Sequence, residues 1–412
     1  MKKAKIVIGA NFGDEGKGLM TDYFCRKAAE AGERCLVICH NGGAQRGHTV
    51  QTRKGLRHVF HHFGSGTFAG ADTWFSEDFI VNPMVFRSEW EELERLGYTP
   101  RVWMHPQCRI TTPFDMILNQ LIEEKRSDAR HGSCGMGIYE TIKRYERMNG
   151  GLERYTHPGT REPMFLRNGA GLRPIRYTLH QIRDQDFYPQ VKKQKLFLDK
   201  EWRAIVESDA LMTHYLDDLE FMKNRVNLSG ISLFSCYDTL VFEGGQGLLL
   251  DQNNREYFPH LTPSNTGLEN PQRLLSDWEK AQSRDSASRR SCETEVCYVT
   301  RPYLTRHGAG RLDTACAKEE INAAMRDLTN LPNPYQGTLR YGKMNPEQLK
   351  KRILRDFAGH PDWKLSLAVT HRNEVETLFA RDKASAGDGA WDREEFLRDF
   401  HRVYEVWGEW LE

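Results

Sequence analysis

The stretch Lys5-Ile-Val-Ile-Gly-Ala-Asn-Phe-Gly-Asp-Glu-Gly-Lys-Gly18 decides how this 412-residue chain folds. Its apolar first half predicts a buried strand, and its second half is a glycine-rich loop that leads into a helix. Glycines let backbone amides crowd around a phosphate, and a helix that begins near Lys17 directs its positive N-terminus at the same place. The stretch therefore predicts a phosphate-binding loop between a strand and a helix.

This loop differs from the Walker A loop of P-loop nucleotidases. It has two extra residues between its first glycine and the Gly-Lys pair, and Gly18 stands where a Ser or Thr would hold magnesium. Asp14 and Glu15 sit inside the loop, where a carboxylate repels phosphate unless it serves as a metal ligand or a base. The sequence thus predicts phosphate chemistry other than that of an ordinary P-loop NTPase.

Composition excludes several classes of protein. The 58 Lys and Arg residues nearly balance the 57 Asp and Glu residues, so no overall field attracts nucleic acid or an anionic membrane. The nine cysteines form no CxxC pair, which argues against a disulfide framework or a zinc site. No apolar segment approaches the roughly 20 residues that span a bilayer. We expect a cytoplasmic protein that binds neither nucleic acid nor membranes.

The order of predicted elements indicates an α/β fold with a mainly parallel central sheet flanked by helices. Strands are expected at 6–10, 35–39, 239–242 and 365–370, and helices at 18–31, 86–96, 116–125 and 138–147. We expect one large domain with its core at about 1–150 and 231–375, a helical insertion at about 151–230 and mobile polar loops at 281–295 and 381–392. An apolar stripe of Phe396, Phe400, Val403 and Trp407 predicts an amphipathic C-terminal helix at 393–411.

Four glycine-punctuated segments each follow a predicted strand or open a predicted helix. They occupy residues 13–18, 42–48, 132–137 and 243–247, and they carry Asp14, Lys17, His48, Ser133 and Gln246. Because loops at the carboxyl ends of parallel strands meet at one edge of a sheet, we expect these segments to form a single site.

Five motifs give the chain a resemblance to adenylosuccinate synthetases. They are Gly13-Asp-Glu-Gly-Lys-Gly18, Gly42-Gly-Ala-Gln-Arg-Gly-His-Thr49, Phe242-Glu-Gly-Gly-Gln-Gly247 with Leu250-Asp251, Thr262-Pro-Ser-Asn-Thr266 and Thr305-Arg-His-Gly-Ala-Gly310. That family joins aspartate to the 6-oxo carbon of a purine nucleotide, normally with GTP and magnesium. The resemblance therefore implies a C–N bond-forming ligase that works as a homodimer.

The resemblance also implies roles for individual residues. Asp14 matches the family's base, which removes the N1 proton of the purine, and His48 matches its general acid. Lys17 and Gln246 complete the implied catalytic set, and Mg²⁺ would bind Asp14 and the Gly47 carbonyl. The implied nucleotide and phosphate contacts are Gly13, Glu15, Gly16, Lys17, Gly18, Gln45, Gly47, Thr49, Ser133, Cys134, Arg147, Thr262, Asn265 and Thr266. The implied aspartate contacts are Arg306, Thr338 and Arg340, and Arg144 or Arg147 would reach into the site of a neighbouring subunit.

Three departures from the family pattern leave the substrates open. The arginine-rich loop that grips aspartate and the ribose survives only as Gly337-Thr-Leu-Arg-Tyr-Gly342, so the sequence allows a deoxynucleotide. The guanine-reading segment aligns with Ala368-Val-Thr-His371, which lacks the aspartate, so ATP suits as well as GTP. A third family segment appears as Ser133-Cys-Gly-Met-Gly137, and residues 150–230 match poorly.

These departures resemble the viral branch of the family, which makes 2-aminoadenine nucleotide precursors from dGMP. That branch usually carries Ser in place of the base, whereas this chain keeps Asp14. We therefore favour an IMP or dIMP substrate, with an ATP-driven dGMP–aspartate ligase as the first alternative. The second alternative is a purine-nucleotide sensor without turnover, although a sensor needs no combination of Asp14, Lys17 and His48.

Overall fold

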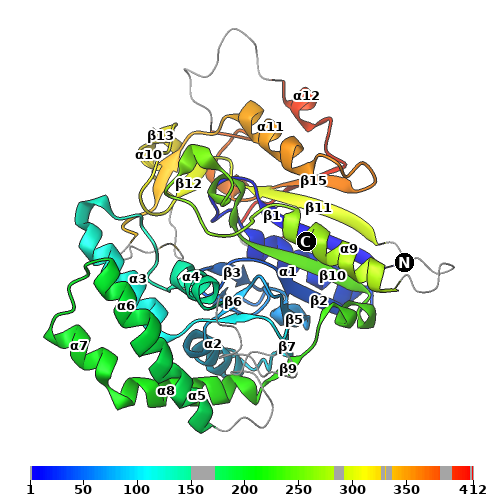
Figure 1. Ribbon diagram of the computed structural model, residues 1–412. Coiled ribbons are helices and arrows are strands. Elements are labelled where there is room, and N and C mark those ends of the chain that lie inside the picture. Colours follow the sequence, from blue (N-terminus) through cyan, green and yellow to red (C-terminus); the bar gives the residue numbers. More distant parts are fainter. Residues whose placement is uncertain are drawn as a thin grey trace.

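The computed structural model describes residues 2–149, 172–282, 292–325, 330, 336–380, 392–408 and 411. The dominant feature of this part of the chain is a nine-stranded sheet with the strand order β16-β15-β11-β1-β10-β2-β5-β7-β9 (Figure 1). Every neighbouring pair in it is parallel. The predicted α/β class with a mainly parallel sheet is confirmed.

The strands of the large sheet are mostly short and buried. They are β1 (Lys3–Gly9), β2 (Cys35–Cys39), β5 (Asp72–Phe75), β7 (Val102–Met104), β9 (Val226–Leu228), β10 (Thr239–Gly247), β11 (Glu293–Thr300), β15 (Lys364–Val369) and β16 (Arg402–Glu405). Smaller sheets pair β12 (Leu304–Arg306) and β13 (Ala315–Cys316) with β14 (Arg340–Gly342), β3 (His48–Gln51) with β4 (Arg57–Phe60), and β6 (Ile80–Val81) with β8 (Arg109–Ile110). The predicted strand at 239–242 thus continues through the whole 243–247 motif.

The helices are α1 (Lys17–Glu30), α2 (Pro83–Arg95), α3 (Pro113–Arg126), α4 (Ile138–Asn149), α5 (Leu172–Ile182), α6 (Tyr188–Lys193), α7 (Lys200–Glu207), α8 (Asp209–Lys223), α9 (Glu269–Gln282), α10 (Glu319–Asn322), α11 (Pro346–Phe357) and α12 (Arg393–Leu397). Local sequence fixes several of their starts. Asn82 caps α2 by accepting from the amide of Met84, and Thr112 forms a capping box with Asp115 at α3. In both helices a proline follows the cap, where it costs no hydrogen bond.

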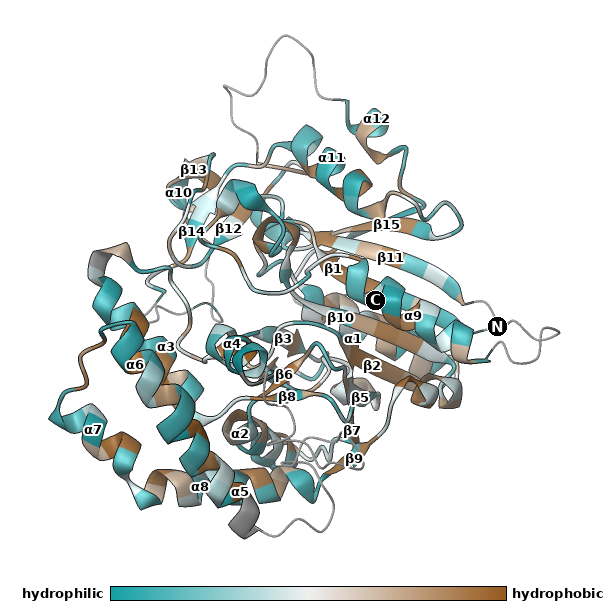
Figure 2. Cartoon of the chain, viewed as in Figure 1, coloured by the Kyte–Doolittle hydropathy of each residue, from teal (hydrophilic) through white to brown (hydrophobic). Residues whose placement is uncertain are grey.

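The sheet is buried on both faces because its strands alternate between two hydrophobic clusters. In β1, Ile6 and Ile8 pack with α9 and α11, whereas Val7 packs with α1 on the other face. The hydropathy colours of Figure 2 show the resulting apolar central strands. This burial fixes the carboxyl edge of the sheet, where the loop after β1 leads into α1.

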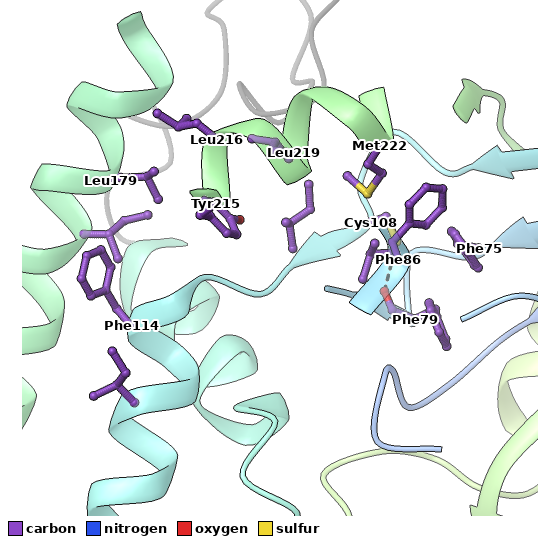
Figure 3. Packing of buried hydrophobic residues seen from close by; sticks show 14 of the residues in the cluster. Phe75, Phe79, Phe86, Cys108, Phe114, Leu179, Tyr215, Leu216, Leu219 and Met222 are labelled. Carbon is purple, nitrogen blue, oxygen red and sulfur yellow. Dashed lines mark hydrogen bonds between the residues drawn. The ribbon is translucent and has the colours of Figure 1, made fainter. Parts of the chain in front are cut away.

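Helices α5 to α8 lie beside α2 and α3 at one side of the large sheet (Figure 1). Their apolar residues share one cluster with α2, α3 and β7, and Figure 3 shows Leu219 and Met222 of α8 close to Phe86 of α2. The Tyr215 hydroxyl donates to the carbonyl of Thr111 at 2.9 Å. The described part of the predicted insertion is therefore helical over residues 172–193 and 200–223 apart from Ser208, but residues 226–228 form β9 and extend the sheet. Residues 151–171 lie outside the described range.

The predicted C-terminal helix at 393–411 is wrong. Only Arg393–Leu397 is helical, and Arg402–Glu405 form β16, which pairs in parallel with β15. Phe396 and Phe400 are buried in the core, but Trp407 is 61% exposed, so the apparent helical stripe is not one face of one element. The open edge of β15 offers backbone partners that override the periodicity.

The two polar stretches predicted as mobile loops lie mostly outside the described residues, namely at 283–291 and 381–391. Where they are described, residues 281 and 282 end α9 and Glu293 begins β11. Among the helices of the described chain, none combines the length and apolar character that crossing a membrane requires.

Candidate active site

The loop between β1 and α1 is folded tightly over the carboxyl end of β1. A side chain at Gly9 would lie 2.3 Å from Oε2 of Glu15 and 2.7 Å from the carbonyl of Gln246, so only glycine fits. Asp14 and Gln246 both have left-handed backbone conformations, with φ of 56° and 65°. Non-glycine residues in this region are strained, and such strain is concentrated at functional sites. Helix α1 begins at Lys17 without a side-chain cap, which leaves its first amides for an anion.

Lys17 and Glu15 are both buried at the base of this loop, at 3% and 2% exposure. Burial lowers the pKa of Lys17, against the opposing effect of Glu15. Burial raises the pKa of Glu15 to about 7, although Lys17 and Asn11 oppose the shift. Neither oxygen of Glu15 has a hydrogen bond of normal geometry from the described residues. The loop thus presents a buried ammonium and a carboxyl group that is easily protonated.

His48 is held by a buried network around Glu243. Its Nδ1 lies 2.9 Å from Oε1 of Glu243, which also accepts from the hydroxyl of Ser65. The other oxygen accepts from Arg46 at 3.3 Å and from the amide of Ser65 at 3.2 Å. Burial alone would raise the pKa of Glu243, but Arg46, His48 and Ser65 lower it to about 2. Glu243 is therefore ionised and fixes the Nδ1–H tautomer of His48.

The ring of His48 is neutral near pH 7 because burial lowers its pKa to about 4, against the pull of Glu243. Gly18 allows the close approach of α1, since a side chain there would lie 2.8 Å from Cβ of His48. The charge on Lys17 also lowers the His48 pKa, so the two groups share one electrostatic environment. The structure thus brings the predicted His48 to the start of α1.

Asp14 is held by the strand and turn around β12. Its carbonyl accepts from Nε of Arg301, and the carbonyl of Gly13 accepts from Thr305 at 3.4 Å. Its carboxylate lies 3.4 Å from Nε2 of His307. The sequence reasoning used the motif that contains His307 but did not select this histidine. Its position between Arg306 and a glycine-rich turn was the available signal.

Arg306 and Arg340 face each other as a residue pair of β12 and β14. Arg306 is 1% exposed, and its guanidinium stacks on Phe12 at 4.5 Å and on Tyr257 at 5.3 Å. Burial and the charge of Arg340 lower the Arg306 pKa to about 10, and burial lowers that of Arg340. Neither Nε has an acceptor in the described part of the chain, and no ion pair to a carboxylate is found there for either residue. Arg306 is buried and Arg340 is partly buried, and two cations without a carboxylate partner among the described residues form a candidate site for a carboxylate ligand. Thr338 is exposed two residues before Arg340.

The remaining predicted nucleotide contacts occupy loops at the same edge. The 262–266 loop packs on the end of β10, where Thr266 donates to the carbonyl of Gly247 at 3.1 Å and Thr262 donates its amide to Leu250 at 2.9 Å. The carbonyl of Asn265 accepts from Asn41, in the loop after β2, at 2.9 Å.

Gln45, Gly47 and Thr49 flank His48 in the loop after β2 and at the start of β3. Oε1 of Gln45 is buried and has no hydrogen-bond donor among the described residues. A buried acceptor without a donor can accept a hydrogen bond from a ligand or a water molecule.

The 131–137 loop, which carries Ser133 and Cys134, packs against the turn that follows Arg306. A side chain at Gly132 would lie 2.7 Å from Cα of Gly308, and Ser133 exchanges hydrogen bonds with Asn119 at 2.9 and 3.1 Å. This loop therefore reaches the side of the site where the arginine pair lies.

The two arginines of α4 are engaged within the chain. Arg144 is buried in an ion pair with Asp115 at 2.9 Å, and Arg147 makes two contacts with Asp186, at 2.6 and 2.7 Å. These contacts tie α4 to α3 and to the helical insertion. A contact of Arg147 with a nucleotide, or of either arginine with a neighbouring subunit, stays a prediction.

No group of three or more His, Cys, Asp or Glu side chains within the described ranges is arranged to hold a metal ion. Magnesium, however, commonly takes only one or two carboxylates from a protein and the rest of its ligands from phosphates and water. The Asp14 carboxylate, in the phosphate-binding loop, is a ligand of the type that suits a magnesium ion that arrives with a nucleotide.

The chain matches one family of known proteins, described as adenylosuccinate synthetase, over residues 6–331. The adenylosuccinate synthetase of Pelodictyon phaeoclathratiforme is 25% identical over 321 residues, which make up 77% of this chain and 66% of the relative. That of Acaryochloris marina is 28% identical over 270 residues, or 63% of this chain and 53% of the relative. The chain thus spans about half to two thirds of the length of these curated relatives.

Two solved structures share the fold. The fully ligated adenylosuccinate synthetase of Plasmodium falciparum has a TM-score of 0.64 at 16% identity, with 90% of this chain and 77% of that chain covered. The succinoaminodeoxyadenylate synthetase of cyanophage S-2L, bound to dGMP and to dATP as an energy donor, has a TM-score of 0.59 at 13% identity, with coverages of 100% and 94%. At these identities the similarity concerns the fold alone.

The buried, neutral ring of His48 predicts how the stability of the folded protein depends on pH. His48 titrates near 6.5 when unfolded and near 4 when folded, so the unfolded chain binds more protons between these values. Stability is therefore lost as pH falls from about 6.5 to about 4, by about 1.4 kcal/mol per pH unit for one proton. In His48→Asn, we expect the unfolding free energy to depend less steeply on pH in this range, by the contribution of about one proton. Urea unfolding at pH 7, 6 and 5 measures the slope.

The control is His401→Asn, which changes an exposed histidine. It should leave the slope of the wild-type protein unchanged. A His48→Asn profile as steep as that of the wild type would show that His48 is not held neutral.

Proposed function

The chain belongs to the adenylosuccinate synthetase family, and from this premise we propose that it joins L-aspartate to C6 of a purine nucleotide of the IMP or dIMP type, with GTP or ATP as phosphoryl donor. One observation carries the proposal. A phosphate-binding loop that holds Asp14 meets, through His307, the paired strands β12 and β14, each of which carries an arginine without a carboxylate partner among the described residues. Adjoining segments would thus supply a binding site for the phosphoryl donor, a base and a binding site for a dicarboxylate.

In the proposed first step, the 6-oxo group is phosphorylated because oxygen on C6 is otherwise a poor leaving group. Asp14 takes the proton from N1, and the electron pair shifts to O6. O6 then bonds to the γ-phosphorus while the bond from that phosphorus to the β-phosphate oxygen breaks, which leaves the nucleoside diphosphate. Lys17 and the amides at the start of α1 would spread the charge of the moving phosphoryl group.

His48, which lies beside the start of α1, would act on the same phosphoryl group. Its ring is neutral in the free protein, and anionic phosphates near Nε2 would favour the protonated, donating form. Glu243 supports this role because it holds the ring by Nδ1 and leaves Nε2 for the ligand. The backbone of Gln246 has a left-handed conformation and packs against the phosphate-binding loop. Gln246 would therefore help to hold that loop in place.

Mg²⁺ would be held by the Asp14 carboxylate and the Gly47 carbonyl, together with phosphate oxygens. When bound, it neutralises charge on the triphosphate. Burial of Glu15 supports this arrangement, because a carboxyl group with a pKa of about 7 adds little negative charge to the loop.

In the proposed second step, the aspartate amine bonds to C6 as the C6–O bond breaks. Phosphate leaves with the electron pair, and a proton of the attacking nitrogen passes to the departing phosphate. Arg306 and Arg340 would bind the carboxylates of aspartate, with Thr338 beside them. Support comes from the Nε of each arginine, which has no acceptor among the described residues, and from the hydrogen bond that Arg340 donates to the carbonyl of Gly308, next to His307.

The proposed nucleotide contacts are the residues of the loops that gather at the carboxyl edge of the sheet. The phosphoryl donor would lie toward the end of β15, where Thr370 donates to the carbonyl of Glu15 at 2.8 Å. We propose a homodimer in which Arg147 acts across the interface, which requires it to leave Asp186.

We expect the purified protein, given L-aspartate and Mg²⁺, to release phosphate and form a succinylated nucleotide with IMP or dIMP. The measurement is phosphate release and product mass for IMP, dIMP, GMP and dGMP, each with ATP and with GTP. Reactions without aspartate are the control. Product from dGMP alone would support the 2-aminoadenylosuccinate alternative, and tight nucleotide binding without phosphate release in any combination would identify a sensor.

Asp14→Asn removes the proposed base and keeps the size of the side chain. We expect kcat to fall by about 10²- to 10⁴-fold, while nucleotide dissociation constants change only a few-fold. Steady-state kinetics and calorimetric nucleotide binding measure the two effects. Asp362→Asn, at an exposed surface carboxylate, is the control and should retain full activity. Near-normal turnover of the Asp14 variant would remove this residue from the base role.

Arg340→Leu removes one proposed carboxylate partner. We expect KM for L-aspartate to rise about 10- to 100-fold, because a charge-assisted hydrogen bond is lost, while KM for the nucleotides stays within about threefold. Saturation curves for each substrate test this split. Arg398→Leu, at an exposed position, provides the matched control. An unchanged aspartate dependence would dismiss the assignment.

A further inference from the structure

Arg301 follows β11 directly and lies against the phosphate-binding loop. Within the sheet, Gly9 of β1 pairs with Val299 of β11, and the amide of Ala10 donates to the carbonyl of Val299 at 2.9 Å. This register places Arg301 next to the loop that follows β1. The residue is 6% exposed, and its Nε donates to the backbone carbonyl of Asp14. The sheet therefore determines where this guanidinium group meets the loop.

The guanidinium group of Arg301 is itself held in place. Its Nη1 donates to the hydroxyl of Tyr303 at 2.9 Å, and that hydroxyl donates to the carboxylate of Glu374. Tyr303 is 2% exposed, so the middle of this chain of contacts is buried. Arginine presents its donors in one rigid plane. Anchoring Nη1 consequently restricts the direction in which Nε points.

The backbone of Asp14 needs such a restraint. Its φ of 56° lies in the left-handed region, where a residue with a Cβ atom is strained. A strained conformation persists only where its surroundings hold it. The preceding carbonyl, that of Gly13, accepts from the neutral hydroxyl of Thr305 at 3.4 Å. Arg301 adds a charged donor at the next carbonyl, and a charge-assisted hydrogen bond is about twice as strong as a neutral one.

The contact acts on the torsion that aims the Asp14 side chain. A hydrogen bond to the carbonyl of this residue restricts rotation about its Cα–C bond, and the side chain leaves from the same Cα. A base must lie within hydrogen-bond reach of the proton that it removes, and a misplacement of about 1 Å can cost about 100-fold in rate. Loss of the contact would therefore misplace the carboxylate without removing it.

We propose that Arg301 is a positioning residue for the reaction: it holds the backbone of Asp14 so that the carboxylate meets N1 of the purine. This inference rests on the proposed function. In this role Arg301 acts through Asp14 and makes no contact of its own with the nucleotide or with aspartate. Its loss should therefore lower kcat and leave substrate binding nearly unchanged.

Two variants of similar length isolate the contact between Arg301 and Asp14. Arg301→Gln can place an amide nitrogen, which is a donor, at the position of Nε, whereas Arg301→Met places a methyl group there. Both variants lose the positive charge and the contact with Tyr303, so they differ in the donor to Asp14. The measurements are kcat, the single-turnover rate at saturating substrates, KM for L-aspartate and calorimetric dissociation constants for the nucleotides. Thermal unfolding verifies that each variant is folded.

We expect Arg301→Met to lower kcat and the single-turnover rate about 10- to 100-fold. KM for L-aspartate and the nucleotide dissociation constants should stay within about threefold of wild type. Arg301→Gln should keep both rates within about fivefold of wild type, because the donor to Asp14 is retained. Should Arg301→Met not fold, Arg301→Lys replaces it, since lysine has a methylene group at the position of Nε. Arg398→Met, at an exposed position, is the control and should behave as wild type.

A double-mutant cycle tests whether Arg301 acts through Asp14. In the Asp14→Asn background, we expect Arg301→Met to change the residual rate by less than about threefold, because the carboxylate to be positioned is already absent. An equal loss of rate in both backgrounds, equal rates in Arg301→Gln and Arg301→Met, or a loss confined to nucleotide affinity overturns the proposal.

The outcomes also separate this proposal from the proposed function. A wild-type protein that turns over normally, with Arg301→Met indistinguishable from it, removes only the role of Arg301. A wild-type protein that releases no phosphate with any combination of nucleotides and L-aspartate overturns both.

Discussion

A single buried carboxylate, Glu243, holds together the segments that form the candidate site. It lies within β10, in the middle of the sheet, and has no exposed surface. Its two oxygens accept from Arg46, His48 and Ser65, which belong to the loop after β2, to β3 and to the segment after β4. An ionised carboxylate in such a place is stable only with several donors, so the loops cannot move away without leaving a buried charge unpaired. The position of His48 relative to α1 follows from this constraint.

The sequence predicted the framework of this arrangement because its signals are local. A strand, a glycine-rich loop and a helix start appear within Lys5–Gly18, and the order of further strands and loops indicates a parallel sheet whose carboxyl edge carries the site. Glu243 and His307 were not selected, although both lie inside motifs that were recognised. Their importance depends on which atoms approach them across the fold, and no sequence spacing reports that. The helix predicted at the C-terminal end was wrong for a related reason. The unpaired edge of β15, with which β16 pairs, exists only in the assembled sheet.

Burial penalises the charged form of several basic groups around the candidate site. It lowers the pKa of Lys17, of Arg306 and of Arg340, and also that of Arg352, which lies in α11 and donates to the carbonyl of Ala10 at 2.8 Å. A lowered pKa of a basic group means that the environment penalises its charged form. Each proposed substrate is an anion, so binding replaces missing partners and relieves this penalty. Binding energy of this kind stabilises the folded protein in proportion to ligand occupancy.

The two carboxyl groups in the phosphate-binding loop would repel anionic substrates if both were charged, and the structure places them in different surroundings. Glu15 is buried, which raises its pKa to about 7, so an approaching phosphate further favours its neutral form rather than meeting a fixed negative charge. Asp14 takes a left-handed backbone conformation and places its carboxylate beside Nε2 of His307. In the proposed reaction this carboxylate serves as the base. An ordinary P-loop needs neither device because it transfers phosphate to groups that require no deprotonation at a purine ring nitrogen. In the proposed reaction, this acidic pair would suit the phosphate-binding loop to activating a nucleobase.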